Sequence, residues 1–138
     1  MKNLWPTSIN VQHQLTPKDF LVNQAEFLGI STNGKVIGNV STYQTDTPRV
    51  NPAAADLVGD VFIHTLTVKA PALKYTFSLL SYAHATLKIF PVHIYSSLTG
   101  EKYIADNIEE VENFTGIIFN MPEIMNSLRA LIIQSPDK

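Results

Sequence analysis

The chain has 138 residues, no cysteine, and a formal net charge of −2 from 10 basic and 12 acidic residues. This length, with 45% apolar residues, predicts a single domain spanning residues 1–138. The balanced charge excludes the electrostatic signature of nucleic-acid or anionic-membrane binding, and the lack of cysteine excludes disulfides and thiolate metal sites. We expect a cytoplasmic protein with no nucleic-acid or membrane partner, because neither a secretory signal nor a bilayer-spanning apolar run is present.

The N-terminal residues give only a local helix signal. Residues 1–15 are polar with scattered apolar side chains, and we interpret them as an arm or an edge strand. A helix start follows at Thr16, Pro17 and Asp19, because threonine caps, proline suits the first helical position, and an acidic side chain favours the positive end of the helix dipole. We expect any helix that begins here to be short.

The next segment has two interpretations. Its apolar residues could continue that helix to Gly29. Alternatively, residues 26–32 and 35–43 are two strands joined by a type I′ turn at Asn33-Gly34. Because Asn-Gly between β-prone segments is the strongest short-range hairpin signal, we prefer the hairpin.

The middle of the chain predicts an antiparallel meander. A polar connection at residues 44–56 leads into three strand-like runs, at residues 57–69, 73–83 and 87–96. Apolar and polar residues alternate along the second run, which indicates a strand with one buried face. Tight turns between the runs would place the apolar residues of all three on one face. The pairs expected from these turns are Val68–Leu73, Leu66–Tyr75, His64–Phe77, Phe62–Leu79, Phe77–Ile94, Leu79–Val92 and Ser81–Phe90.

The last third of the chain changes to a helical period. After a short segment at residues 102–105, Asn107 begins a capping-box-like pattern followed by apolar residues at helical spacing. A second helix starts at residues 120–123. The sequence therefore predicts an α+β fold: an antiparallel β-meander of about five strands, mainly within residues 16–97, packed on one face by two C-terminal helices within residues 107–134.

The sequence carries no nucleotide-binding, catalytic or metal-binding motif, so we expect no cofactor and no metal. The histidines are the remaining candidates for acid–base chemistry, because histidine titrates near neutral pH. His64 falls on the apolar face, where we favour a neutral core residue with hydrogen-bonded ring nitrogens over a buried base with a lowered pKa. We expect His84 to be solvated at a turn, and His13 has no neighbouring group to recruit it.

The outer face of the predicted sheet collects hydroxyls, an imidazole and a phenol. His93 is expected beside Tyr95 and across from Ser78, on a face that could bind a polar ligand or another protein. An ordinary solvated sheet face is the plainer interpretation. The loop at residues 44–56 is a second candidate surface, because Arg49 could clamp a carboxylate or a phosphate. The candidate binding residues are Asp46, Arg49, Lys74, Thr76, Ser78, His93 and Tyr95.

Three classes of function remain open. We favour a small non-enzymatic binding module, such as an adaptor, inhibitor or immunity-type protein, which uses the outer sheet face and the 44–56 loop to bind another protein. One alternative is a small hydrolase or isomerase that uses His64 or His93 with a carboxylate. The other is a self-assembling homo-oligomer whose exposed strand edges pair between copies, a property that a binding module could share.

Overall fold

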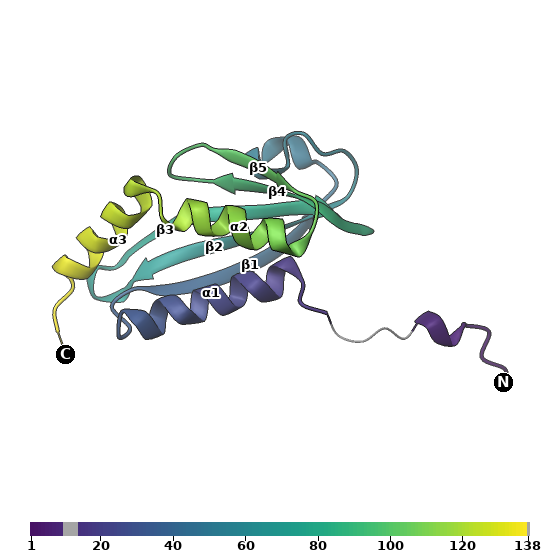
Figure 1. Ribbon diagram of the computed structural model, residues 1–138, viewed down its shortest axis with the longest axis horizontal. Coiled ribbons are helices and arrows are strands. Elements are labelled where there is room, and N and C mark those ends of the chain that lie inside the picture. The colour runs from purple at the N-terminus through teal and green to yellow at the C-terminus, as the bar shows by residue number, and fades with distance from the viewer. Residues whose placement is uncertain (10–13, 138) are drawn as a thin grey trace.

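A five-stranded antiparallel sheet forms the centre of the fold, with its strands side by side in chain order (Figure 1). The computed structural model describes residues 1–9 and 14–137. The strands are β1 (Ile37–Thr45), β2 (Val61–Ala70), β3 (Tyr75–Ala85), β4 (Lys88–Ser96) and β5 (Lys102–Ala105). The predicted meander of five strands is confirmed. Residues 26–32 are not one of its strands, however, and the short segment at residues 102–105 forms β5 instead.

The helices cover one face of this sheet. Within the described residues, the α-helices are α1 (Pro17–Ser31), α2 (Ile108–Phe119) and α3 (Pro122–Gln134). Leu21 of α1, Val111 of α2 and Ile124 of α3 share one core with Leu80 and Tyr82 of β3. The predicted α+β fold with two C-terminal helices is therefore confirmed, and α1 adds a further helix to it. None of the helices in the described part of the chain has the length and apolar character needed to cross a membrane.

Helix α1 replaces the first half of the predicted hairpin. Thr16 and Asp19 form a reciprocal capping box, in which each side chain accepts the backbone N–H of the other at 3.1 Å. Asn33 and Gly34 both have positive φ, and Gly34 N–H donates to the Gly29 carbonyl at 2.9 Å, closing the helix. The predictions of a short helix and of a hairpin turn are wrong, because two successive left-handed residues end a helix as readily as they close a hairpin.

The register between β2 and β3 also differs from the prediction. We expected the turn at residues 70–71, but a short 3-10 turn, η4 (Pro71–Leu73), and Lys74 extend it. Lys74 has a φ of 53°, so it is a turn residue and not part of the strand. An irregularity next to Leu66 then leaves Leu79 as an extra residue in β3. The observed pairs are Val68–Phe77, Leu66–Leu80, His64–Tyr82 and Phe62–His84.

The pairs predicted between β3 and β4 are wrong for a related reason. The turn between these strands lies at residues 86–87, because Ala85 pairs with Lys88. A second register irregularity, between Ala83 and Ala85, moves the remaining pairs further. The observed pairs are Leu80–Ser96, Ser81–Tyr95, Tyr82–Ile94 and Ala83–His93.

The segment between β1 and β2 packs on the face of the sheet opposite the helices. It contains two short 3-10 turns, η2 (Pro48–Val50) and η3 (Pro52–Ala54). The alanines of η3 form a second, smaller core with Val61, Ile63 and Ala83, and Figure 1 shows the segment passing beside β4 and β5. The outer sheet face, which we expected to be solvated, therefore has a covered half and an open half.

Candidate functional site

The residues predicted to form an outer binding face are separated in the structure. Thr76 and Ser78 are exposed on the open half of that face. Tyr95 is half-buried and packs against the second core, so it contributes to folding as well as to the surface. Lys74 lies in the turn before β3 and not on the face of the sheet. These four residues do not form one continuous patch.

His93 lies on the covered half, opposite Ala83 rather than Ser78. It lines a cavity of about 130 Å³ together with Asp56. Burial lowers the pKa of His93, and the nearby Asp56 carboxylate partly offsets that effect. The tertiary structure therefore places a carboxylate near this histidine, but the cavity is well below the roughly 300 Å³ of the smallest typical ligand pockets.

Two charged residues of the 44–56 loop, Asp46 and Arg49, line a separate pocket. Asp46 and Arg49 are both exposed, and the pocket has a volume of about 380 Å³. The loop is anchored by Asn51, whose side chain accepts the N–H of Ala53 at 2.9 Å and donates to the Tyr43 hydroxyl at 2.8 Å. The loop is thus an ordered part of the fold in which the side chains of Asp46 and Arg49 remain available to solvent.

His64 and His84 form a buried pair. Their Nε2 atoms lie 3.0 Å apart, and the two residues are only 5% and 6% exposed. Nδ1 of His64 contacts the Thr42 hydroxyl at 2.8 Å, and Nδ1 of His84 contacts the carbonyl oxygen of Ala85 at 2.8 Å. The expectation of a solvated His84 is wrong, because the register of β3 carries this residue onto the helix-covered face, opposite Phe62.

These contacts determine where the protons lie. A carbonyl oxygen only accepts, so with one proton on each ring His84 carries its proton on Nδ1, and its Nε2 accepts the Nε2–H of His64. Nδ1 of His64 then accepts the Thr42 hydroxyl proton. Burial, and then the nearby His84 and Lys18, lower the pKa of His64 to about 4. His64 is therefore neutral at pH 7, with both ring nitrogens hydrogen-bonded.

The histidine pair lines a pocket of about 350 Å³ at the N-terminal end of α1. The hydroxyl of Thr86 is buried in the same region without a hydrogen-bond partner among the described residues. Residues 1–9 and 14–137 contain no group of three or more histidine, aspartate or glutamate side chains that could hold a metal. Two imidazoles fall short of the ligands that zinc requires. His13 lies outside the described residues.

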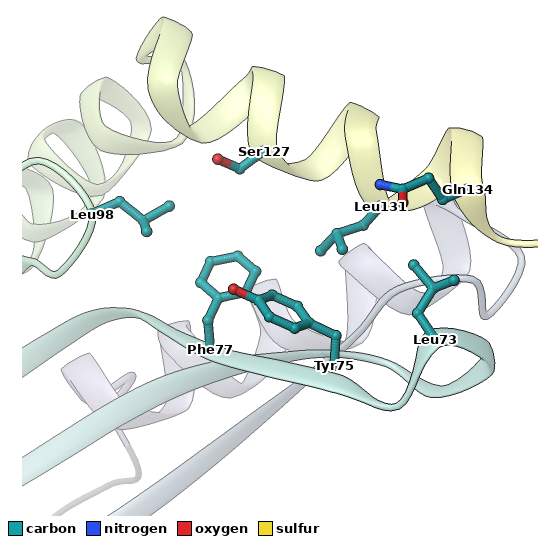
Figure 2. Close-up of a pocket in the computed structure, with 7 residues that line it drawn as sticks. All are labelled: Leu73, Tyr75, Phe77, Leu98, Ser127, Leu131 and Gln134. Carbon is teal, nitrogen blue, oxygen red and sulfur yellow. The ribbon is translucent and has the colours of Figure 1, made fainter.

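An apolar groove separates α3 from the start of β3 (Figure 2). Its volume is about 540 Å³, within the range of small-molecule pockets. Figure 2 shows the rings of Tyr75 and Phe77 pointing from the sheet toward α3, with Leu98 and Leu73 on either side of them. The residues that line the groove are Leu73, Tyr75, Phe77, Leu98, Ser127, Leu131 and Gln134.

The chemistry of the groove is apolar and aromatic. Tyr75 and Phe77 have ring centroids 6.0 Å apart, a spacing typical of interacting aromatic pairs. The side chains of Ser127 and Gln134 already donate to backbone carbonyls one turn earlier in α3, at 2.7 and 2.9 Å. No charged residue occurs among the described residues that line the groove. The groove therefore favours an apolar occupant.

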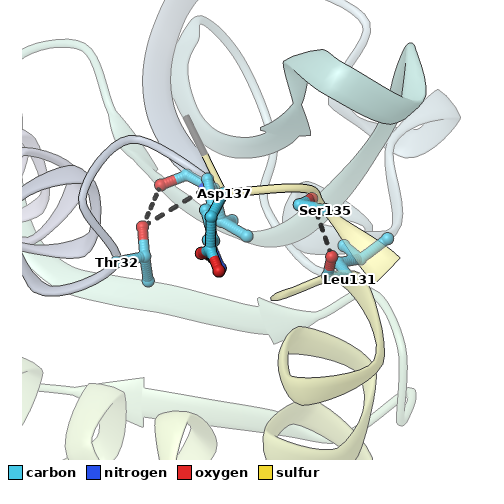
Figure 3. Close-up of polar contacts among 6 residues, drawn as sticks. Thr32, Leu131, Ser135 and Asp137 are labelled. Atoms are coloured by element: carbon cyan, nitrogen blue, oxygen red, sulfur yellow. Dashed lines mark hydrogen bonds and ion pairs between the residues drawn. The ribbon is translucent and has the colours of Figure 1, made fainter. Parts of the chain in front are cut away.

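Helix α3, which forms one wall of the groove, is tied down at its C-terminal end (Figure 3). The Ser135 hydroxyl donates to the Leu131 carbonyl at 2.8 Å, and nearby the Thr32 hydroxyl closes the turn between α1 and β1. Lys35 and Asp137 form an ion pair at 2.6 Å between that turn and the C-terminal residues. Asp137 is exposed, so water and salt screen this ion pair, and the packing of Leu131 is the stronger attachment.

The sequence alone did not reveal this groove. The alternation of Tyr75 and Phe77 with polar residues predicts only that both side chains lie on the apolar face of a strand. The sequence pattern assigns that face to burial under the C-terminal helices. In the structure α2 packs over β4 and β5, and α3 lies at one end of the sheet (Figure 1). Tyr75 is consequently 52% exposed.

The sequence matches no protein family, and neither a curated protein nor a solved structure is detectably similar to it. Any assignment of function therefore depends on the geometry of the described residues. Two arrangements offer chemistry of their own: the apolar groove beside α3 and the histidine pair beside α1.

Proposed function

We propose that this protein is a small non-enzymatic binding module that holds an apolar segment of a partner protein in the groove between α3 and β3. The observation that supports this function is an apolar groove of about 540 Å³, lined on its sheet side by the rings of Tyr75 and Phe77. The segment between β1 and β2 covers part of the outer sheet face, so the groove is a better candidate than that face. The cysteine-free sequence is compatible with a module that works in the cytoplasm.

The composition of the groove sets the kind of partner that it suits. Leu73, Leu98 and Leu131 surround the rings of Tyr75 and Phe77, so recognition would rest on burial of apolar and aromatic side chains. Each buried side chain contributes roughly 1.5–3 kcal/mol before the costs of ordering. Two or three anchors of this size suit a weak, reversible complex rather than a permanent one.

An apolar dye tests this function directly on the purified protein. We expect 8-anilinonaphthalene-1-sulfonate to shift the amide NMR signals of residues that line the groove. Leu98→Glu should weaken dye binding roughly tenfold, because it replaces an apolar contact worth about 1.4 kcal/mol. Ile133→Glu is the matched control, since Ile133 lies on α3 outside the groove and is 81% exposed. Shifts located elsewhere, or equal effects of the two variants, would contradict the proposal.

A second function is favoured by the Thr42–His64–His84 array. A hydroxyl that donates to an imidazole, which is itself oriented by a third group, is the arrangement of nucleophilic hydrolases. In such a reaction Thr42 Oγ1 would attack the carbonyl carbon of an ester while its proton passes to Nδ1 of His64, which then protonates the leaving alkoxide. Water would release the acyl group and restore the Thr42 hydroxyl. A pocket of about 350 Å³ has room for a small ester.

The low pKa of His64 makes this function the weaker candidate. A base with a pKa of about 4 is neutral at pH 7 but provides little driving force for proton transfer. Hydrolysis of p-nitrophenyl acetate tests it directly. If the array is catalytic, Thr42→Val should reduce turnover by about 100-fold or more, whereas His93→Gln should have little effect. Hydrolysis that does not depend on Thr42 would eliminate the hydrolase and leave the binding module.

A further inference from the structure

The N-terminal residues of the chain carry an apolar surface that the domain does not cover. All of residues 1–9 are exposed, and they include the short turn η1 (Thr7–Ile9). Leu4 and Trp5 are 84% and 72% exposed. Leu4 and Trp5 are adjacent in the sequence, and neighbouring exposed apolar side chains are typical of an interaction site. The described residues therefore leave both side chains uncovered.

The groove beside α3 is the complementary surface. Tyr75 and Leu98 are half-exposed there, and a tryptophan and a leucine have the apolar and aromatic character that its lining favours. None of residues 1–9 is among the described residues that line the groove of the same chain. An N-terminal segment that enters the groove would therefore come from another molecule.

We propose that the groove between α3 and β3 receives Leu4 and Trp5 from the N-terminal segment of a second copy of this chain. The inference rests on the proposed function of the groove and names its partner. The indole of Trp5 packs against the rings of Tyr75 and Phe77, which are already arranged as an aromatic floor. Reciprocal exchange of the two segments produces a closed dimer with two equivalent contacts.

Tryptophan fluorescence and molar mass together test this exchange. Trp5 is the only tryptophan in the chain, so its emission reports on this segment alone. We expect a dimer by light scattering, with tryptophan emission at shorter wavelength than in the unfolded protein. On dilution the dimer and the short-wavelength emission should be lost together. Leu98→Glu should produce a monomer with the emission of an exposed indole, and the Ile133→Glu control should behave as the wild type.

Three results would overturn the exchange. The first is emission at the unfolded position at every concentration, and the second is a dimer unchanged by Leu98→Glu. The third is short-wavelength emission from a monomer, which would place Trp5 in the groove of its own chain.

A variant with Leu4→Ser and Trp5→Ser separates this inference from the proposed function of the groove. We expect the double variant to bind 8-anilinonaphthalene-1-sulfonate in the groove more tightly than the wild type, because the competing segment is gone. Equal binding in the groove by both proteins would refute the exchange and leave the binding function standing. No dye in the groove of the double variant, with circular dichroism showing it folded, would refute both.

Discussion

The Nε2 atoms of His64 and His84 lie 3.0 Å apart in a buried pair that also engages Thr42 and the carbonyl oxygen of Ala85. One proton on each ring satisfies every contact in this chain of hydrogen bonds. A second proton on His64 would occupy the nitrogen that accepts from Thr42, and it would place a charge beside Lys18 in a desolvated site. The pair therefore links the stability of the fold to pH.

We expect the free energy of unfolding to fall as the pH drops from 6.5 toward 4. The pKa of His64 is lowered from 6.5 to about 4 in the folded protein, so the unfolded chain binds more protons in this range. Stability is therefore full above pH 6.5 and is lost as the pH falls, by about 3 kcal/mol at most. Urea unfolding at a series of pH values between these limits measures the loss.

Two variants isolate the contribution of His64 from that of the carboxylates. His64→Gln removes the titrating group, so the dependence of stability on pH between 6.5 and 4 should become shallower. His93→Gln is the control, because His93 is less buried and should leave most of the dependence in place. An unchanged slope in His64→Gln would show that the histidine pair is not its source.

The buried hydroxyls of Tyr82 and Thr115 connect the sheet to α2 at 2.6 Å. We expect Tyr82→Phe to lower the free energy of unfolding by about 1–2 kcal/mol, because the Thr115 hydroxyl is left without this partner. Thr115→Val should cost a similar amount, and the double variant should cost less than the sum of the two. Strict additivity in denaturant unfolding would show that the two hydroxyls are not coupled.

The same tyrosine gives a separate alkaline prediction. Burial raises the pKa of Tyr82 well above the usual range of tyrosine, and its hydrogen bond to Thr115 only partly opposes this. In an absorbance titration of the chain's five tyrosines, we expect one to remain protonated until the protein unfolds. Tyr82→Phe should abolish this late step. Its persistence in the variant would assign it to another tyrosine.

Two glycine substitutions should have opposite effects on stability. A Cβ on Gly38 would lie 2.9 Å from both Cα and Cβ of Ala25 in α1, so Gly38→Ala forces the helix away from the sheet. We expect a loss of about 1–3 kcal/mol. A Cβ on Gly116 meets nothing within 4 Å, so Gly116→Ala should stabilise α2 by about 0.5–1 kcal/mol. Thermal unfolding of both variants tests this, and a neutral Gly38→Ala would contradict the close contact.

The end of α1 offers a test of the revised role of Asn33-Gly34. Gly34 has a φ of +78°, and a side chain in this left-handed conformation costs roughly 1–2 kcal/mol. We expect Gly34→Ala to destabilise the fold by about 1 kcal/mol. Asn33→Gly should cause no comparable loss, since Asn33 has a positive φ of its own. Chemical denaturation compares the two, and equal losses would argue against the conformational cause.

Local patterns in the sequence predicted much of the fold. The two C-terminal helices begin at Ile108 and Pro122, directly after the capping pattern at Asn107 and within the predicted start at residues 120–123. The alternation of apolar and polar residues along the run at residues 73–83 correctly indicated a strand of a meander. These signals depend on a few neighbouring residues, so they hold wherever the segment lies in the tertiary structure.

The candidate sites were less accessible to such reasoning. Tyr75 and Phe77 were correctly recognised as apolar residues of a strand, but their incomplete coverage depends on where α3 packs. The contact between the rings of His64 and His84 depends on the turn that ends at Lys74 and on the register irregularity that follows this turn in β3. A change of a few residues in a turn alters every partner along a strand.

By itself, the sequence determined the α+β class, the antiparallel meander and the C-terminal helices, because period-two and helical repeats express which side of each element is apolar. Only the tertiary structure decided three further features: the helical use of Asn33-Gly34, the contact between His64 and His84, and the groove beside α3. Each of these depends on how distant segments pack together. Interactions between distant segments leave no periodic signal in the order of the residues.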